Sequence, residues 1–166
     1  MALCFMEFKS ENPDKNELEA FSNRYNVMAK LSPLEKSFAL NEDPSESQRR
    51  NANWRAEGFH VLLWALGFVD RLDFPAELCN LKEDLVHLFS RSEPAFRDAA
   101  VLRSATEILD QADLALRLNW ACVNAKTKNQ PVPGTLNRGV VYERHYAFNW
   151  LINYRNQEWD DVSTDT

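Results

Sequence analysis

The chain has 166 residues, of which 25 are acidic and 19 are basic, so its formal net charge is −6. Binding to nucleic-acid phosphates relies on clustered lysine and arginine, so this balance argues against nucleic acid and permits a basic protein partner. The length fits one domain, and a total of four glycines argues against a turn-rich β architecture. We therefore expect residues 1–166 to form a single helical domain.

Capping signals mark two helices near the start of the chain. The dipeptide Asn12-Pro13 predicts the start of a first helix, which ends near Lys30. Ser32 and Glu35 have the spacing of a capping box, in which two side chains satisfy the free backbone donors of a helix start. They predict a short second helix.

The most apolar helix-length run of the chain is residues 54–67, with the sequence WRAEGFHVLLWALG. Before it, Asp43, Pro44 and Glu46 resemble another capping box, so the predicted helix spans residues 44–67. Apolar side chains cover most of the circumference of its second half, which is typical of a buried helix. We expect this helix to lie at the centre of the core.

Three further helices are predicted in the second half of the chain. Asn80 is the expected N-cap of a short helix. Residues 96–126 are the longest periodic segment and predict one long helix. The apolar residues of its expected core face are Leu102, Ala105, Leu109, Ala112, Leu116 and Val123. After a proline-containing loop, residues 140–154 predict the last helix.

These elements predict an all-α, irregular bundle of five or six helices, with the helices at residues 44–67, 96–126 and 140–154 at its centre. Four tryptophans lie in the predicted helices among apolar neighbours, and we expect them to pack in the core. They are Trp54, Trp64, Trp120 and Trp150.

The last residues, 155–166, form an acidic tail. Because Trp159 is apolar, we expect it to return to the helical body. Asp160 and Asp161 would then pair with Arg144, Arg117 or Arg55, which would make the tail an integral latch. If the tail is free, it is instead a peptide that another protein can bind.

Several charged residues lie in the most apolar helices and are the only candidates for a functional site. They are Glu57, Asp113, Arg117, Glu143, Arg144 and His145. One hypothesis places them in a single cleft, where burial shifts their pKa values as acid–base catalysis requires. The other treats them as a satisfied network that fixes how the helices pack, and we favour it because no ligand motif accompanies them. Asp113 and Arg117 can also pair along their own helix.

The histidines and cysteines show no metal-binding spacing. His60, His87 and His145 lie on three different predicted helices, so a zinc site would have to be assembled from distant segments. We expect no metal and no cofactor, and we interpret His60 as a hydrogen-bonded core histidine. Motifs for phosphate loops, dinucleotides and esterases are absent from the sequence.

Cysteine usage and hydropathy indicate the compartment. The three cysteines form no CxxC pair, and their odd number argues against a disulfide framework. Disulfides are typical of oxidising compartments, so we expect a cytoplasmic protein. The longest uncharged apolar run, residues 59–69, is much shorter than the ~20 residues that cross a bilayer, and no membrane span is expected.

Four stretches resemble a known family. They are NWRAEGFHVLLWALG at residues 53–67, RSATEILDQADLALRLNWA at 103–121, GVVYERHYAFNWL at 139–151 and WDDVSTDT at 159–166. On these residues, from about Leu31 onwards, the chain resembles the bacterial domain-of-unknown-function family 4272. The combination of ERHYAFNWL and WDDVSTDT is the most specific part. The resemblance implies a shared fold and carries over no activity, cofactor or functional residue.

We expect a non-enzymatic binding protein that captures a basic protein partner, for example an immunity protein that neutralises a toxin. The alternative is a small hydrolase or ligand-binding enzyme that uses the buried carboxylate, arginine and histidine side chains. A cleft that contains these residues would favour the enzyme. A third class, a structural subunit, would show a large exposed apolar patch on the first helix.

Overall fold

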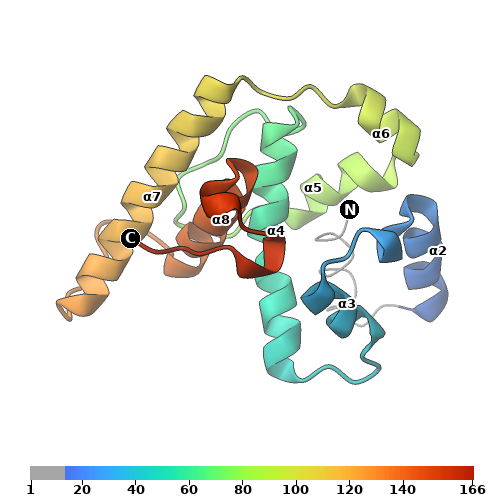
Figure 1. Cartoon of the computed structure of the whole chain (residues 1–166), viewed down its shortest axis with the longest axis horizontal. Coiled ribbons are helices and arrows are strands. Elements are labelled where there is room, and N and C mark those ends of the chain that lie inside the picture. The colour runs from blue at the N-terminus through green and yellow to red at the C-terminus, as the bar shows by residue number, and fades with distance from the viewer. Residues whose placement is uncertain (1–13) are drawn as a thin grey trace.

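The computed structural model describes residues 14–166, which form seven α-helices and no strand. The fold class predicted from the sequence, an all-α irregular bundle, is confirmed, but the described residues form seven helices where five or six were predicted. Helix α8 (Arg138–Leu151) lies between α7 (Ala105–Thr127) and α4 (Glu46–Ala65) and packs against both (Figure 1). Among the described residues, no helix has the length and apolar character needed to cross a bilayer.

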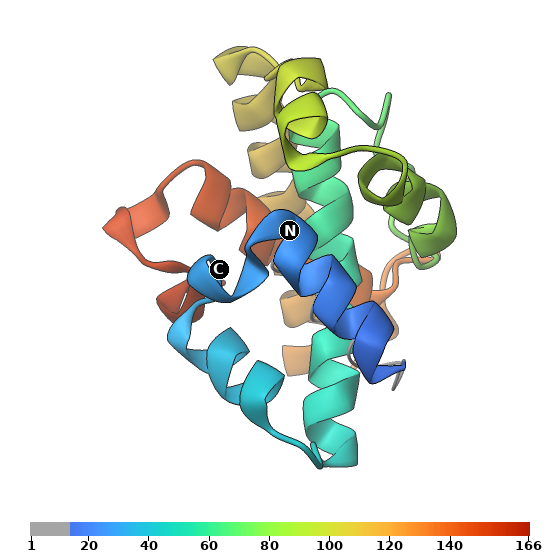
Figure 2. The ribbon, with the colours of Figure 1, turned by 90° about the vertical axis from the view of Figure 1, so that its right-hand side faces the viewer.

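The N-terminal helices cover the other side of α4. Helix α2 (Lys15–Tyr25) begins after Asp14, whose side chain caps it. The predicted start at residues 12–13 lies outside the described residues. Asn26 has the left-handed φ of 46° and ends α2 earlier than predicted, and a 3-10 turn, η1 (Val27–Ala29), follows. The view in Figure 2 confirms that α2 and α7 lie on opposite sides of α4.

Helix α3 (Pro33–Leu40) begins with the predicted capping box. The hydroxyl of Ser32 accepts a hydrogen bond from the backbone N–H of Glu35, and the Glu35 carboxylate accepts one from the backbone N–H of Ser32 at 2.9 Å. Both bonds satisfy backbone donors that a helix start otherwise leaves free. The short helix therefore has a defined first residue.

The central helix α4 begins two residues later than predicted. Its N-cap is Ser45 and not Asp43, and Ser45 forms the capping box with Gln48. The geometry favours Ser45 because its hydroxyl reaches the N–H of the third helical residue. At the other end, Gly67 has a φ of +78°, a conformation that glycine adopts without strain. The chain leaves the helix there.

Two short helices follow, α5 (Leu81–Phe89) and α6 (Glu93–Ala99). Asn80 precedes α5 as predicted, but it makes no side-chain capping bond. Its amide donates instead to the side chain of Glu83 at 2.7 Å. Ser92 caps α6 by accepting from a backbone N–H.

The predicted helix over residues 96–126 is interrupted, so this prediction is wrong. Residues 100–104 are not helical, and they separate α6 from α7. The backbone N–H groups of Val101 and Arg103 donate, both at 2.9 Å, to carbonyls at the end of α4. Ser104 then starts α7 with its own capping box. Bonds to a neighbouring helix and a new cap together replace the continuous helix that the periodicity predicts.

Helix α7 also buries a face that shares only Ala112 with the predicted one. Its buried residues are mostly small: Ile108, Ala112, Ala115, Asn119, Cys122 and Ala125. Several large apolar residues that we expected in the core are exposed: Leu102, Leu109, Leu116, Trp120 and Val123. Small side chains let the α7 backbone approach α8 closely, which the bulky leucine face would prevent.

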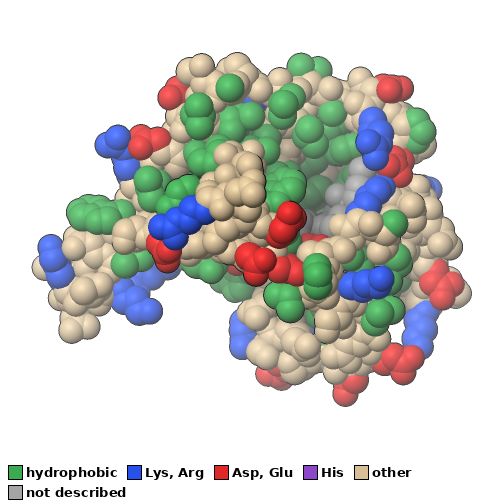
Figure 3. Space-filling view, viewed as in Figure 1, with side chains coloured by type: hydrophobic (Ala, Val, Ile, Leu, Met, Phe, Trp, Pro, Cys, Tyr) green, Lys and Arg blue, Asp and Glu red, His purple; other side chains and the backbone are tan. Residues whose placement is uncertain are grey.

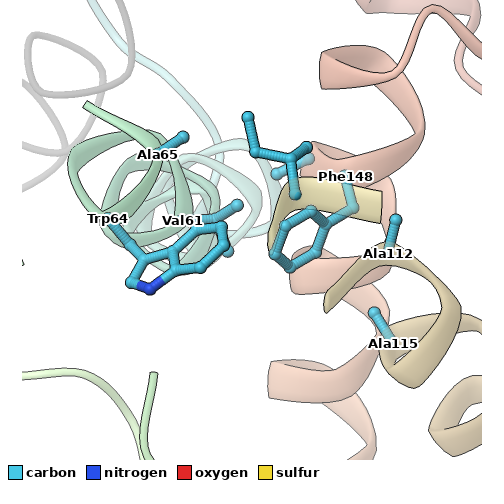
Figure 4. Packing of buried hydrophobic residues seen from close by; sticks show 8 residues of the cluster. Val61, Trp64, Ala65, Ala112, Ala115 and Phe148 are labelled. Carbon is cyan, nitrogen blue, oxygen red and sulfur yellow. The ribbon is translucent and has the colours of Figure 1, made fainter. Parts of the chain in front are cut away.

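The core between the three long helices centres on Phe148 of α8. Figure 4 shows its ring between Val61 and Trp64 of α4 on one side and Ala112 and Ala115 of α7 on the other. The Phe148 and Trp64 rings meet edge to face, with their centres 5.8 Å apart. The prediction that Trp64 packs in the core is confirmed, whereas the same prediction for Trp150 is wrong, because its side chain is exposed.

Helix α8 spans residues 138–151, where residues 140–154 were predicted. Asn137 is its N-cap and accepts a hydrogen bond from the backbone N–H of Gly139 at 3.0 Å. A side chain at Gly139 would collide with the Trp54 ring, so this glycine allows α8 to pack directly on α4. Two 3-10 turns follow, η2 (Tyr154–Asn156) and η3 (Trp159–Asp161).

Candidate functional site

A buried ion pair joins α4 to α8. Glu57 is 0% exposed, and its Oε2 accepts a hydrogen bond from Nε of Arg144 at 3.0 Å. Its Oε1 accepts from the backbone N–H of Cys79 at 2.6 Å. Nη1 of Arg144 donates to the carbonyl of Asp73, also at 2.6 Å. The pair therefore fastens the loop before α5 to both helices, as expected of a satisfied network.

A second ion pair lies nearer the surface. Nη1 of Arg55 donates to Oε2 of Glu143 at 3.0 Å. The Arg55 guanidinium carbon lies 4.3 Å from the centre of the Tyr146 ring and 5.6 Å from that of Trp159, within cation–π range. Burial raises the pKa of Glu143, and Arg55 opposes this effect. The Arg55 side chain is 27% exposed, so this pair reaches solvent.

His145 is a buried residue of α8. It is 1% exposed, and no described residue forms a hydrogen bond with its Nδ1. Burial lowers the pKa of its imidazole below the ordinary value of 6.5, so the ring is neutral at pH 7. His145 is a neutral core side chain with an unused ring nitrogen.

Asp113 and Arg117 lie on the exposed face of α7. Oδ2 of Asp113 accepts a hydrogen bond from Nε of Arg117 at 2.7 Å, and the two side chains are 55% and 74% exposed. The structure brings Glu57, Glu143 and Arg144 into the contact between α4 and α8. It does not bring all six candidate residues into one cleft.

The tail lies against α8 through Trp159. The centre of the Trp159 ring is 5.0 Å from that of Tyr146 and 5.4 Å from that of Trp150, and both contacts are edge to face. The Tyr146 hydroxyl donates a hydrogen bond to the backbone carbonyl of Trp159. Contacts of this kind are worth about 0.5–1.5 kcal/mol per aromatic pair beyond the buried area.

The tail aspartates have partners other than the predicted ones. Oδ1 of Asp160 accepts from the Ser32 hydroxyl at 2.5 Å, and Oδ2 accepts from the backbone N–H of Leu34 at 2.9 Å. The predicted pairing with arginine is wrong, because Arg55, Arg117 and Arg144 bind Glu143, Asp113 and Glu57. The start of α3 attracts Asp160 through free N–H groups and the positive end of the helix dipole. Asp161 is exposed.

Two buried asparagines hold the rest of the tail, and sequence reasoning missed this role. Nδ2 of Asn149 donates to the carbonyl of Ser163 at 2.7 Å, and Nδ2 of Asn119 donates to the carbonyl of Thr164 at 3.2 Å. Both asparagines interrupt an apolar face, and a buried amide requires a hydrogen-bonding partner. A polar amide on an apolar helix face was therefore the sequence signal that could have predicted this role.

A cavity of about 670 Å³ opens between α4, η1, the start of α3 and the tail. We call it the α4–tail pocket. Its floor is apolar and includes Phe59, Leu62, Leu63, Leu66, Phe96 and Trp150. The tail forms one wall, with Trp159 among its lining residues. Its size and its mainly apolar lining are typical of a ligand-binding pocket.

The edge of the α4–tail pocket is acidic. The carboxylates that line it are Glu35, Glu158, Asp160 and Asp161. The lining also includes Lys30, but its ammonium is paired with Glu93 at 2.8 Å. Figure 3 shows acidic side chains (red) beside a hollow with apolar side chains (green) on this face. This arrangement suits an apolar group that carries a positive charge next to it.

Comparison with known proteins identifies the family. Searches of curated proteins and of solved structures found no match to the chain. A family model described as "Domain of unknown function (DUF4272)" matches residues 1–162, nearly the whole length. The matched range includes the resembling stretches in α4, α7 and α8 and residues 159–162 of the stretch in the tail. The chain therefore belongs to the DUF4272 family.

Proposed function

We propose that this protein is a non-enzymatic binding protein that captures a basic protein partner in the α4–tail pocket. The observation that carries the proposal is the apolar floor of this pocket beside the exposed carboxylates of Glu158 and Asp161. An immunity protein that neutralises a basic toxin in the cytoplasm is one concrete form of this function.

The apolar floor and the carboxylates of the pocket have separate roles in partner binding. Burying an apolar side chain of the partner against Leu62 and Leu66 supplies affinity, at about 25 cal/mol per Å² removed from water. The carboxylates supply orientation and fast association with a positively charged surface. Glu158 and Asp161 are exposed and are available to a partner.

The geometry favours binding over the alternative, a small hydrolase or ligand-binding enzyme. A catalytic acid or base must reach the proton of its substrate directly or through one water. Glu57 and His145 are 0% and 1% exposed, and Glu57 already binds Arg144 and a backbone N–H. If the protein were an enzyme, Glu143→Gln and His145→Ala would abolish turnover while the fold persists.

A labelled helical peptide with leucine on one face and lysine on the other tests the proposal. We expect fluorescence anisotropy to show binding to the full chain that weakens as salt concentration rises. The double variant Glu158→Gln/Asp161→Asn should bind roughly two- to tenfold more weakly, because two exposed charge pairs are lost. Leu62→Gln should also weaken binding, because it makes the pocket floor polar.

The matched control is Glu42→Gln/Asp98→Asn, which makes the same change in net charge at exposed acids outside the pocket. Its binding should stay close to that of the parent. Equal weakening in both double variants would indicate general attraction by net charge and would contradict the pocket. A pull-down from native lysate with these variants then selects the partners that depend on the pocket.

A further inference from the structure

Three potential metal ligands from separate segments meet beside α4. His60 lies on α4, Cys79 in the loop before α5, and Asp84 in the first turn of α5. One potential ligand atom from each residue lies within 4.8 Å of those of the other two. Nδ1 of His60 and Oδ2 of Asp84 are 2.8 Å apart, so His60 is hydrogen-bonded as the sequence predicted. The sequence spacing could not reveal this cluster, because only the fold assembles it.

The donor set determines which metal fits. An imidazole nitrogen, a thiolate sulfur and a carboxylate oxygen are the ligands that Zn²⁺ takes in proteins. With bonds of about 2.0–2.3 Å in a tetrahedral site, the ligand atoms lie roughly 3.3–3.8 Å from one another. The three side chains would therefore have to move by about 1 Å to bind the ion together. We propose that His60, Cys79 and Asp84 bind Zn²⁺ and leave its fourth position open to water or another small ligand.

The charges around the cluster favour a cation. Asp84 is 2% exposed, and its carboxylate contacts the His60 ring. Glu57 also contacts the Cys79 backbone, while its charge is matched by Arg144. A divalent ion would compensate the buried Asp84 carboxylate and the thiolate together.

Zn²⁺ binds cysteine as the thiolate, so metal binding at Cys79 should release the thiol proton and weaken as pH falls.

The surroundings also support access and orientation. Cys79 and His60 are partly exposed, so an ion can enter without unfolding the core. Oε1 of Glu57 accepts the backbone N–H of Cys79 at 2.6 Å and fixes the loop that carries the thiol. Such outer contacts commonly orient metal ligands. The cluster shares no residue with the α4–tail pocket, so the two proposals are independent.

Titration of the metal-free full chain with Co²⁺ tests the site. We expect one equivalent to produce a thiolate-to-cobalt charge-transfer band and the intense visible bands of tetrahedral cobalt, and Zn²⁺ to abolish both by displacement. Zn²⁺ should also protect Cys79 from alkylation and raise the melting temperature, whereas Mg²⁺, which prefers oxygen ligands, should do neither. Absence of the charge-transfer band would overturn the proposal.

The decisive variant is Cys79→Ser, which changes one atom in a loop and should leave the helical circular dichroism unchanged. It should lose the charge-transfer band and bind Zn²⁺ at least about tenfold more weakly. Cys122→Ser removes the buried thiol of α7, and Cys4→Ser removes one outside the described residues, so both serve as matched controls. A band that persists in Cys79→Ser and disappears in either control would place the metal elsewhere and refute the site.

Discussion

The Glu57 carboxylate holds three parts of the chain together, because its two oxygens bind Arg144 of α8 and the loop at Cys79. A buried carboxylate is tolerated only when its charge and lone pairs have partners. Asp113 and Arg117 form the same kind of carboxylate–guanidinium pair at the surface, where an ion pair contributes little to stability. The two pairs therefore allow the effect of burial to be measured within one protein.

We predict that Arg144→Met lowers the free energy of unfolding by about 3–5 kcal/mol, because Glu57 loses its ion-pair partner in the core. Urea denaturation followed by circular dichroism measures this change. The matched control, Arg117→Met, removes the same side chain from the exposed pair and should leave the free energy of unfolding close to that of the parent. Equal losses in both variants would show that burial does not set the strength of the inner pair.

His145 should produce a specific pH dependence. Burial lowers its pKa in the folded state, so below the ordinary value of 6.5 the unfolded chain binds protons that the folded chain does not. The free energy of unfolding should therefore fall as pH falls below about 6.5. We expect His145→Leu to weaken this slope.

Denaturation of parent and His145→Leu at several pH values between 5 and 7.5 measures the effect. Burial also raises the pKa values of Glu35 and Glu143, which makes stability fall as pH rises above the ordinary value of 4.5. Both carboxylates are present in both proteins, so the difference between the two curves isolates His145. A constant difference across this range would show that His145 does not cause the slope.

At the level of elements, α3 is capped from two directions. Its own Ser32 and Glu35 form the capping box, and Asp160 of the tail adds a carboxylate at the same helix end. We predict that Asp160→Ala lowers the free energy of unfolding by about 0.5–2 kcal/mol, the usual cost of losing a cap. Thermal denaturation of the full chain is the measurement.

The control for this change is Asp161→Ala, which removes the neighbouring exposed carboxylate. Its melting temperature should match that of the parent. If Asp161→Ala proved as destabilising as Asp160→Ala, the loss would reflect the total charge of the tail and not the cap on α3.

The sequence predicted the helices well where caps and periodicity act locally, as in α3 and the apolar half of α4. It failed at α7, because periodicity identifies the face with the bulkiest apolar residues, such as Leu109 and Leu116. The buried face shares only Ala112 with the predicted face and otherwise carries residues such as Ile108 and Ala115, since close packing against α8 decides which side faces inward. The break at residues 100–104 depends on carbonyls of α4 and has no local signal beyond the cap at Ser104.

The candidate site could be predicted only in part, because contacts between helices have no local signal in the sequence. Glu57 and Arg144 were recognisable, because charges in apolar helices need partners. Their pairing with each other joins residues 87 positions apart in the chain. The contacts between Asp160 and α3 join residues 126 and 128 positions apart. Such contacts depend on how helices dock, which periodicity along one helix does not encode.

For the whole molecule, the tail joins the N-terminal helices to α7 and α8. Trp159 packs on α8, Asp160 binds α3, and Asn119 and Asn149 bind tail carbonyls. Truncation after Tyr154 should therefore cost about 3 kcal/mol or more, because an aromatic contact and a cap are lost and two buried amides lose their partners.

Each 1 kcal/mol corresponds to roughly 2–4 °C for a chain of this size, so we expect the melting temperature to fall by at least about 6 °C. Differential scanning calorimetry of the truncated and full chains measures this shift. As a control, Asp165→Asn removes an exposed carboxylate of the tail that contacts Arg155 and Ser163, and it should change the melting temperature little. An unchanged melting temperature after truncation would contradict a stabilising role for the tail.

The contact between Ser32 and Asp160 also affects the timing of folding during synthesis. These residues are 128 positions apart. A ribosome that adds about 5–20 residues per second needs roughly 6–26 s to cover that distance. Until then, α3 lacks its second cap and the pocket lacks its acidic wall. A newly made chain therefore passes through a period in which the apolar floor of the pocket is uncovered and open to chaperones, and this period ends only after Asp160 has been added.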